Sequence, residues 1–528
     1  MTPSGLGVAN PEPLFCDYFD LNVRWRGARR AVAFEDATLS WKELGRRSYQ
    51  VANGLSRLGI GRGDAVVVLL DNRLETAEIV LGVIRCGATV VPINLAISDE
   101  AIVRQIDDCG AIAVLATPAE ATRVERVISR FEAGHRVVVG AAVPNWTRYE
   151  EWRAAQSTEP PPVACAPDDL LTVVYSSGTT GIPKGIAHTH LTRTRNMLEI
   201  GRALRLNEDS VWISALGFYS NAAMLPVLMT LLIGGSVAIV PRFESESFLR
   251  AIEKHRATHF LAVPLMLRQL LKDPALDSLD LSSVELIVVG GASVDPDVKE
   301  AGRARFGCIL LELYGLTEGF VTITSSTDGI EKRASVGRPV PGADLKILRD
   351  DGSEAAIGEA GEIVGFSQSL MAGYLNRPQE TAAVFLQDEQ RRRWLRTGDI
   401  GRLDGDGFLY YVGRKRDLIV TGGQNVYPID IEDVGGRHPD VEQIAVVGVP
   451  HPKWDETPVA AVVLRRGSTL SCEELQAWIN ERVGRQQRVS AVVTLSSMPV
   501  NALGKVLKRE LRQIVLAATP SIATGGAE

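Results

Sequence analysis

Short apolar runs alternate with amphipathic stretches along most of the chain. Runs rich in Val, Ile, Leu and Ala predict buried strands, and an apolar spacing of three to four residues predicts a helix. The strands are predicted at Ala65–Leu70, Ala88–Pro92, Ile112–Ala116, Leu170–Tyr175, Val237–Val240, His259–Val263 and Leu286–Val289, and a helix at Glu75–Cys86. Alternation of this kind predicts parallel sheets covered by helices, so we expect an α/β fold.

The pattern changes after about residue 340. Gly and Asp become frequent, and a turn sequence at Asp404–Gly407 separates short predicted strands. This texture predicts a small β-rich unit. From Asp417 onward the pattern is again mixed. Strands are predicted at Ile444–Val449 and Val459–Leu464, and a helix at Cys472–Val483.

One long apolar stretch, Ala222–Pro241, is nearly long enough to cross a bilayer. Pro226 stands near its start, and Gly234 and Gly235 interrupt it before a strand-like run. A buried helix, a turn and a buried strand explain this pattern better than a transmembrane helix. We therefore expect no integral membrane segment.

Composition narrows the class of protein. The chain has 528 residues and a formal net charge of -7, which disfavours general binding to nucleic acid or to anionic membranes. The six cysteines are scattered and form no CxxC motif, which disfavours a disulfide framework or a zinc cluster and favours a cytoplasmic protein. They are Cys16, Cys86, Cys109, Cys165, Cys308 and Cys472.

The most informative segment is Tyr175–Gly185, which reads YSSGTTGIPKG. It follows a predicted strand and precedes a helical run that starts near His190. Backbone N–H groups and hydroxyls exposed at such a junction suit a polyphosphate, and Lys184 adds a charge. The spacing differs from that of the common nucleotide P-loop. A lone Gly-rich stretch would more simply be a flexible surface loop, but the ordered mixture of Ser, Thr, Gly and Lys favours phosphate binding.

This segment resembles the phosphate-binding signature of the adenylate-forming superfamily. That superfamily contains acyl- and aryl-CoA synthetases, adenylation domains of peptide synthetases, and luciferases. Seven further matches follow in the same order: Gly290–Ser293, Tyr314–Glu318, Gly337–Pro339, Arg396–Asp399, Gly413–Asp417, Gly422–Pro428 and Pro499–Lys505. The resemblance implies an N-terminal domain (1–415) with a β-rich subdomain, and a mobile α+β C-terminal domain (416–528). It implies ATP, Mg²⁺ and coenzyme A as cofactor or co-substrates.

The resemblance also implies a nucleotide site. Tyr314 would lie against adenine, Asp399 would accept both ribose hydroxyls, and Arg414 would support the ribose and phosphates. Taken alone, Tyr314 is equally well explained as a core tyrosine and Asp399 as a turn residue. The residues implied to bind ATP are Ser176, Ser177, Gly178, Thr179, Thr180, Lys184, Gly291, Ala292, Ser293, Glu312, Tyr314, Asp399 and Arg414.

Three residues would act in catalysis. Thr317 would bind the α-phosphate, and Glu318 would hold Mg²⁺, since a hard cation prefers carboxylate oxygen. Lys505 would stabilise the charge that builds up when a carboxylate attacks the α-phosphorus. The C-terminal domain would then turn about Arg416, where relatives usually have Asp or Lys. Gly422 and Gly423 would face the thiol in the second half-reaction.

The residues implied to line the acid pocket are Phe218, Tyr219, Ser220, Asn221, Val263, Gly290, Leu313, Gly315 and Gly319. Ser220 aligns with an Asp that pairs with the ammonium of amino-acid substrates in some relatives, so an α-amino acid is disfavoured. Tyr219 stands where many relatives have His. Leu313 stands where long-chain and many phenylpropanoid relatives have Gly. We expect a compact aryl, alicyclic or short-to-medium acyl acid.

Three functions remain open at this point. The first is a free-standing acyl- or aryl-CoA synthetase, and the second is an adenylation enzyme that loads a carrier protein. The third is a non-catalytic scaffold, which the presence of Thr317, Glu318, Asp399 and Lys505 disfavours. The identity of the acid and a homodimeric state are left open by the sequence.

Overall fold

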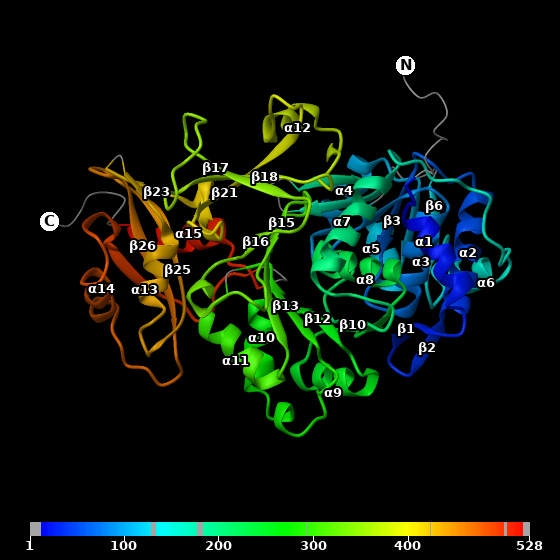
Figure 1. The fold of residues 1–528 in the computed structure, drawn as a ribbon, viewed down its shortest axis with the longest axis horizontal. Coiled ribbons are helices and arrows are strands. Elements are labelled where there is room, and N and C mark those ends of the chain that lie inside the picture. Colours follow the sequence, from blue (N-terminus) through cyan, green and yellow to red (C-terminus); the bar gives the residue numbers. More distant parts are fainter. Residues whose placement is uncertain are drawn as a thin grey trace, which may run out of the picture.

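Four β-sheets and the helices around them form the structure (Figure 1). It is a computed structural model that describes residues 12–127, 134–176, 183–292, 294–422, 424–500 and 504–520. The predicted α/β class, with helix-covered and largely parallel sheets, is confirmed.

The largest sheet has nine strands. In spatial order they are β16 (Arg338–Pro339), β15 (Val321–Ile323), β14 (Ile309–Gly315), β13 (Leu286–Gly290), β12 (His259–Ala262), β10 (Val211–Ser214), β11 (Ser236–Ile239), β1 (Arg30–Phe34) and β2 (Ala37–Ser40). Strands β14 through β1 are mutually parallel, and β2, β15 and β16 pair antiparallel at the two edges. The carboxyl ends of β13 and β14 therefore lie side by side.

The second sheet has eight strands. In order they are β19 (Gly373–Tyr374), β9 (Lys184–Thr189), β8 (Leu170–Ser176), β4 (Thr89–Pro92), β3 (Ala65–Leu69), β5 (Ala113–Ala116), β6 (His135–Val138) and β7 (Thr147–Arg148). β3 is buried along its whole length because it lies between two parallel neighbours. Strand β9 was not predicted. It pairs antiparallel with β8, so a strand separates the Gly-rich segment from the following helix.

Helices cover these two sheets. They are α1 (Phe15–Trp25), α2 (Trp41–Arg57), α3 (Leu74–Arg85), α4 (Asp99–Cys109), α5 (Pro118–Val127), α6 (Tyr149–Ala154), α7 (His190–Ala203), α8 (Asn221–Ile233), α9 (Ser245–His255), α10 (Pro264–Lys272) and α11 (Pro296–Phe306), with two short 3₁₀ helices, η1 (Pro274–Asp277) and η2 (Ile330–Lys332). α8 is the apolar stretch that resembled a membrane span. It is buried, packs against α1 and α7, and ends at Gly234, whose φ is +97°. No helix in the described part of the chain is long and apolar enough to cross a membrane.

A small sheet follows, which we call the connecting sheet. It contains β17 (Asp344–Leu348), β18 (Gly361–Phe366), β20 (Phe385–Gln387), β21 (Arg393–Leu403) and β22 (Leu409–Arg414), with α12 (Pro378–Val384) beside it. This sheet is the predicted β-rich unit, and all its pairings are antiparallel. The 3₁₀ helix η3 (Lys415–Asp417) comes directly after β22.

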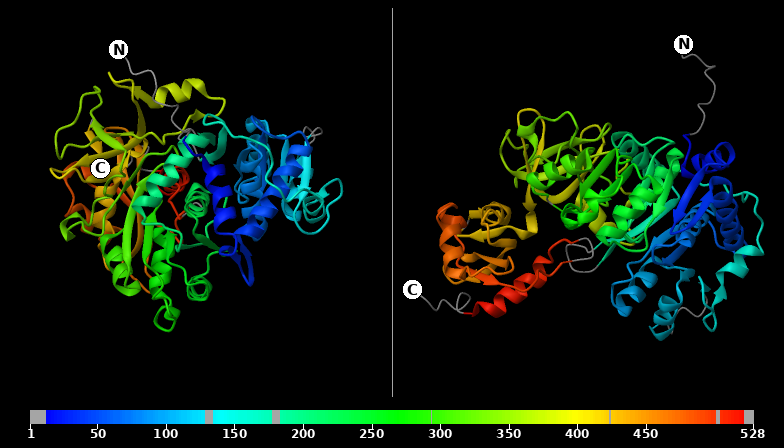
Figure 2. Two further views of the ribbon diagram at one scale, coloured as in Figure 1. Left: turned by 45° about the vertical axis from the view of Figure 1, so that its right-hand side comes forward. Right: turned by 90° about the horizontal axis from the view of Figure 1, so that it is seen from below.

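The last sheet, the C-terminal sheet, contains β23 (Ile419–Thr421), β24 (Gln424–Val426), β25 (Val441–His451), β26 (Asp455–Leu464) and β27 (Ala491–Thr494). Its helices are α13 (Pro428–Gly435), α14 (Cys472–Asn480) and α15 (Lys508–Ala518), with the 3₁₀ helix η4 (Arg485–Gln487). This sheet lies at one end of the long axis, opposite α2 and α6 (Figure 1). The segment before α15 reaches back towards the rest of the molecule (Figure 2).

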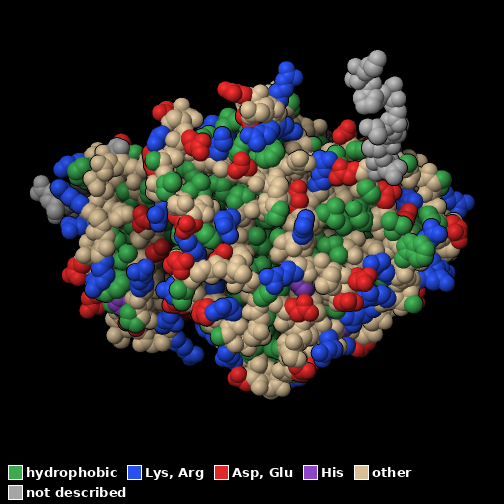
Figure 3. All heavy atoms as spheres, viewed as in Figure 1, with side chains coloured by type: hydrophobic (Ala, Val, Ile, Leu, Met, Phe, Trp, Pro, Cys, Tyr) green, Lys and Arg blue, Asp and Glu red, His purple; other side chains and the backbone are tan. Residues whose placement is uncertain are grey.

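The surface carries charges of both signs. On the face in Figure 3, Lys and Arg side chains are interspersed with Asp and Glu side chains. This mixture agrees with the small negative net charge of the sequence. A long-range field of one sign is therefore not a feature of this face.

Candidate active site

Three predicted nucleotide-binding side chains form one cluster, which is held by a hydrogen bond and an ion pair. The hydroxyl of Tyr314, in β14, donates to Asp399 Oδ2 at 2.8 Å, and Arg414 Nε lies 3.5 Å from Asp399 Oδ1. Asp399 and Arg414 are directly opposite each other in the register of β21 and β22. Burial raises the pKa of the Asp399 carboxyl, while Arg414 and the Tyr314 hydroxyl lower it in part. The cluster therefore joins the nine-stranded sheet to the connecting sheet.

Two aromatic rings lie near the ring of Tyr314, and the neighbouring strand β13 ends in glycine. Its ring centroid is 5.8 Å from that of Tyr411 and 6.5 Å from that of Phe320. Gly290 ends the neighbouring strand β13, and a Cβ there would lie 2.8 Å from the carbonyl oxygen of Leu313. Gly291 follows with φ +88°, a conformation that favours glycine. Gly290 and Gly291 therefore place no side chain beside the end of β14.

Lys505 approaches the cluster from the far end of the chain. It is partly buried, and its ammonium interacts electrostatically with Arg414, Asp399 and Arg416. Burial, reinforced by Arg414 and only partly offset by Asp399, lowers the pKa of Lys505 to about 8. Gly504 beside it lies against Leu265 of α10, since a Cβ on Gly504 would be 3.4 Å from the Leu265 Cβ. The C-terminal segment is thus docked on the nine-stranded sheet's helices.

Thr317 and Glu318 lie in the turn between β14 and β15. The Glu318 carboxylate accepts a hydrogen bond from the Tyr374 hydroxyl at 3.0 Å, and His188 Nε2 donates to the Thr317 carbonyl at 2.7 Å. Burial raises the pKa of Glu318. Among the described residues no basic side chain forms an ion pair with it. A half-buried carboxylate that forms no ion pair fits Mg²⁺, which accepts one or two carboxylates and phosphate oxygens as ligands.

The predicted phosphate loop connects β8 to β9. Ser176 ends β8 and is opposite Lys184, the first residue of β9. The Lys184 ammonium pairs with Glu380 and lies 4.9 Å from the centroid of the Tyr374 ring. Lys184 and Glu318 therefore share Tyr374 as a neighbour. Ser177, Gly178, Thr179 and Thr180 lie outside the described residues, as do Ser293 and Gly423.

Glu312 lies within β14, two residues before Tyr314, and Ala292 lies in the loop after β13. The Glu312 carboxylate forms a buried ion pair of 2.5 Å with Lys299 of α11. Burial raises the pKa of Glu312, and Lys299 lowers it in part. The Val294 backbone also lowers the pKa of Glu312, and Val294 follows the loop that contains Ala292. Glu312 therefore lies close to this loop, and its predicted contact with ATP stays a prediction.

The predicted acid-binding residues lie around the start of α8. Ser220 is the N-cap, and its hydroxyl accepts from the Ala223 N–H at 3.2 Å. The Phe218 side chain is buried and Tyr219 is half-buried. Next to them is a cavity of about 350 Å³, whose lining includes Leu216, Tyr219, Val263, Leu265, Met266 and Gly504. The Lys505 segment therefore forms part of the wall of a cavity on the acid side.

Leu313 and two glycines complete the predicted pocket. Leu313 is opposite Gly290 in the pairing of β13 and β14, and its side chain packs against the main hydrophobic core. Gly315 ends β14, where a Cβ would lie 3.0 Å from Val321. Gly319 has φ +107° and lies directly against the backbone of Ser369. Only glycine fits that last position without a shift of the backbone.

Asn221, one of the predicted acid-binding residues, contacts a charged residue that was not predicted. Arg193 of α7 is fully buried, and its Nη2 donates to Asn221 Oδ1 at 2.9 Å. Its Nη1 has no hydrogen-bond partner, and no described carboxylate forms an ion pair with it. Burial lowers the pKa of Arg193 to about 9. Its spacing from Met197 and Ile200 places Arg193 on the buried face of α7, but a charged side chain on a helix is normally exposed.

Arg416 and Gly422 lie further along the chain. Arg416 is in η3, between the connecting sheet and the C-terminal sheet, with its Nε 3.6 Å from Asp417. Gly422 donates its N–H to the Trp454 carbonyl at 2.8 Å and lies against the Trp454 ring. In the described part of the chain, these contacts of Gly422 are within the C-terminal sheet and not with Asp399 or Tyr314.

Comparisons with known proteins agree with this geometry. Residues 19–375 match the family described as AMP-binding enzyme, and residues 430–505 match the AMP-binding enzyme C-terminal domain. The chain belongs to the AMP-binding enzyme family. The predicted resemblance to adenylate-forming enzymes is therefore confirmed.

Three similar proteins illustrate the range of the family. A feruloyl-CoA synthase from Amycolatopsis sp is 33% identical over 92% of this chain and 95% of its own length. An indoleacetate–CoA ligase from Aromatoleum aromaticum is 30% identical over 95% of this chain and 98% of its own length. The structure of the amide bond synthetase McbA from Marinactinospora thermotolerans superposes with a TM-score of 0.85 at 28% identity, over 95% of this chain and 99% of that chain. These relatives include two proteins named for thioesters of coenzyme A and one named for amide bonds.

Proposed function

We propose that this protein is an AMP-forming acid–thiol ligase that makes an acyl thioester of coenzyme A. In the first half-reaction a carboxylate oxygen attacks the α-phosphorus of ATP, a P–O bond forms, and pyrophosphate leaves with the electrons of the broken P–O bond. In the second, the thiolate of coenzyme A attacks the acyl carbon, and AMP leaves. Both relatives named as CoA ligases cover nearly the whole chain, which supports this reaction.

The position of Lys505 is the observation that carries the proposal most directly. Its ammonium lies in electrostatic range of Asp399 and Arg414, and its neighbour Gly504 lines the acid-side cavity. Attack of a carboxylate on a phosphate brings two anions together, so a cation between them is worth more in the transition state than in the ground state. Lys505 would supply that charge. Tyr314 and Asp399 would hold the nucleoside in place for the attack.

Glu318 would hold Mg²⁺, and the metal would neutralise charge on the phosphates of ATP. The Tyr374 hydroxyl orients the carboxylate, because it donates to one of its oxygens at 3.0 Å and leaves the other free for a metal. Thr317 would donate its hydroxyl to the α-phosphate, with its carbonyl fixed by His188. The loop at 177–182 and Lys184 would hold the remaining phosphates.

A change in the C-terminal domain would separate the two half-reactions. Residues 1–415 would act as one domain and 416–528 as a mobile one, with Arg416 at the hinge. All five strands of the C-terminal sheet come after Arg416, which supports this boundary. Rotation about η3 would withdraw Lys505 and bring Gly422 and Gly423 to the thiol.

The acid would be compact and would have a second polar group. Leu313 fills space beside Gly290, so a long chain has less room there. A buried guanidinium without a carboxylate partner costs several kcal/mol, and an acceptor on the substrate offsets that cost. Arg193 would therefore bind a hydroxyl, carbonyl or second carboxylate of an aryl, alicyclic or short acyl acid, through Nη1 or with Asn221.

A second candidate is an acid–amine ligase, in which an amine replaces the thiol. The likeness to an amide bond synthetase over nearly the full chain favours it over unrelated chemistry. A carrier-protein thiol is a third acceptor of the same adenylate. The first half-reaction is the same in all three cases.

One experiment separates these acceptors. Acid-dependent exchange of pyrophosphate into ATP is measured over a panel of aryl, alicyclic and linear acids, with and without a hydroxyl or second carboxylate. The best acid is then offered coenzyme A, a panel of amines or a carrier protein. We expect the thioester of coenzyme A. If an amide is the main product, the acyl acceptor is an amine and not the thiol of coenzyme A. If no acid supports pyrophosphate exchange, the proposed adenylation is wrong.

A further inference from the structure

A buried cluster of two cysteines and a histidine lies outside the candidate active site. Cys16 comes from α1, Cys165 from the segment before β8, and His190 is the first residue of α7. One ligand atom from each, the two Sγ atoms and a ring nitrogen, lies within 4.8 Å of the others. Three segments that are far apart in the sequence thus bring sulfur, sulfur and nitrogen to one point.

The two sulfurs are close but not bonded. Cys16 Sγ and Cys165 Sγ are 3.3 Å apart, and each lies 3.7 Å from the carbonyl oxygen of Ile84. Two sulfurs at Zn–S bonds of about 2.3 Å in a tetrahedral site lie about 3.8 Å apart, so the pair needs to open by only about half an ångström. A thiolate is the form of cysteine that binds metals.

The ring nitrogens of His190 lack hydrogen-bond partners among the described residues. The His190 side chain is fully buried. Burying an imidazole without a hydrogen-bond partner is unfavourable, because its ring nitrogens lose their bonds to water. A bond from one ring nitrogen to a metal removes part of this cost. The histidine therefore gives a reason for a ligand that is independent of the two cysteines.

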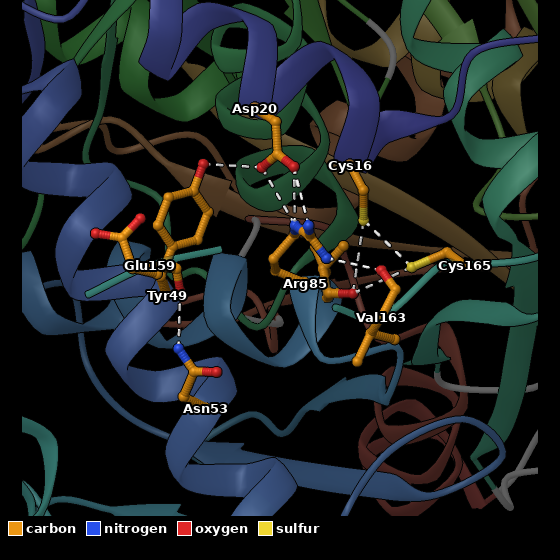
Figure 4. Close-up of polar contacts among 9 residues, drawn as sticks. Cys16, Asp20, Tyr49, Asn53, Arg85, Glu159, Val163 and Cys165 are labelled. Carbon is orange, nitrogen blue, oxygen red and sulfur yellow. Dashed lines mark hydrogen bonds and ion pairs between the residues drawn. The ribbon is translucent and has the colours of Figure 1, made fainter. Parts of the chain in front are cut away.

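The Arg85 side chain contacts a residue near each cysteine (Figure 4). Arg85 Nη1 donates to the Val163 carbonyl at 2.9 Å, and Nε and Nη2 donate to Asp20 Oδ2 at 3.1 and 3.0 Å. Asp20 stands one helical turn after Cys16, on the same face of α1. Val163 is two residues before Cys165. The same guanidinium thus holds the helix of one sulfur and the segment of the other, as outer partners of metal sites do.

We propose that Cys16, Cys165 and His190 bind one Zn²⁺ ion that ties α1 to the segment before β8 and to α7. Two thiolates, a neutral imidazole and Zn²⁺ have no net charge, and the adjacent pair of Arg85 and Asp20 has none either. A neutral site is compatible with burial. Any proton still on Cys16 leaves to solvent when the metal binds.

Three protein ligands leave the fourth tetrahedral position for water. Cys165 remains partly exposed, which gives the ion and the water a path. The sequence disfavours a zinc cluster because its cysteines form no short metal-binding motif. Cys16 and Cys165 are 149 positions apart. The fold, and not the local sequence, brings the ligands together.

The test uses the full-length protein, metal-free, reduced and free of oxygen. It is titrated with Zn²⁺ and, in parallel, with Co²⁺ as a spectroscopic probe, and bound metal is counted after the excess is removed. We expect one Zn²⁺ per chain, a thiolate-to-cobalt charge-transfer band, and a higher Tm with Zn²⁺. The double variant Cys16→Ser/Cys165→Ser should bind Zn²⁺ at least about 100-fold more weakly and lose the band.

Cys472→Ser is the matched control and should bind as the wild type does, because Cys472 is on α14 of the C-terminal sheet. If the double variant fails to fold, Cys165→Ala is measured instead, since this position is partly exposed. The proposal is wrong if reduced wild type retains no zinc, or if the cysteine variants retain as much as the control. It is also wrong if peptide mapping finds a Cys16–Cys165 disulfide in air while the reduced protein binds no metal.

Discussion

On the nucleotide side of the candidate active site, the Asp399 carboxylate accepts a hydrogen bond from Tyr314 and forms an ion pair with Arg414, whereas Arg193 has no carboxylate partner among the described residues. A buried charge that already faces an opposite charge keeps its position before any substrate binds. A buried charge without a counter-ion is completed only by what binds next to it. We infer that the nucleotide side is preformed, and we propose that the acid side is where this chain selects its substrate.

The largest effect is expected from Lys505→Ala. Without the ammonium, adenylation should slow by about 10²–10³-fold, because charge on the attacking carboxylate and the α-phosphate is no longer offset. Thioester formation from a supplied acyl-adenylate should change by less than about threefold. Lys508→Ala is the control, since Lys508 pairs with Glu432 inside the C-terminal domain. Equal loss in both half-reactions would mean that the lysine is misassigned.

Asp399→Ala should disrupt the preformed side. Loss of the carboxylate removes the proposed ribose contacts and leaves Arg414 and the Tyr314 hydroxyl without their partner. We expect kcat/KM for ATP to fall about 100-fold. Tyr314→Phe removes only the internal hydrogen bond and should cost less than about tenfold. The preformed network would be disproved if both variants had the same small effect.

Arg193→Met tests the acid side. For acids with a second polar group, kcat/KM should fall about tenfold or more, and for acids without one it should stay the same or rise. The Tm should stay or rise, because an unpaired buried charge is removed. Arg195→Met, on the same helix but paired with Glu12 at the surface, should change neither quantity. A uniform loss with all acids would contradict a selective role.

Leu313→Gly should have a smaller effect. Removing this side chain opens space beside Gly290, so kcat/KM for acids longer by a few methylenes should rise about tenfold relative to the short acids. For Leu313→Val, kcat/KM for the longer acids relative to the short acids should lie between the values for the glycine variant and the wild type. If the ranking of chain lengths does not change, Leu313 does not limit the pocket.

The sequence predicted the fold better than it predicted the acid side. Long apolar runs such as Leu286–Val289 and the interrupted stretch Ala222–Pro241 became a strand, a helix and a second strand as expected, because periodicity and Gly or Pro interruptions are local signals. Strand β9 was missed because its pairing with β8 depends on a chain reversal that composition does not indicate.

The candidate site shows the same limit. Tyr314, Asp399 and Arg414 were grouped by ordered motifs and do lie together, although their roles stay predictions. Arg193 was missed because a charged residue on a helix is normally exposed, and only the fold shows that its side chain is fully buried. The two cysteines beside His190 were missed because 149 positions separate them. Residues that act through non-local contacts have little local signature.

The pH dependence of adenylation tests the role of Lys505 most directly. Burial and Arg414 lower the pKa of Lys505 from 10.5 to about 8, so the ammonium is lost as pH rises through that value. In the wild type, kcat/KM for ATP in pyrophosphate exchange should therefore fall above about pH 8. In Lys505→Arg, whose guanidinium stays charged, that fall should disappear. A wild-type profile flat to pH 10, or an unchanged fall near pH 8 in the arginine variant, would contradict the account.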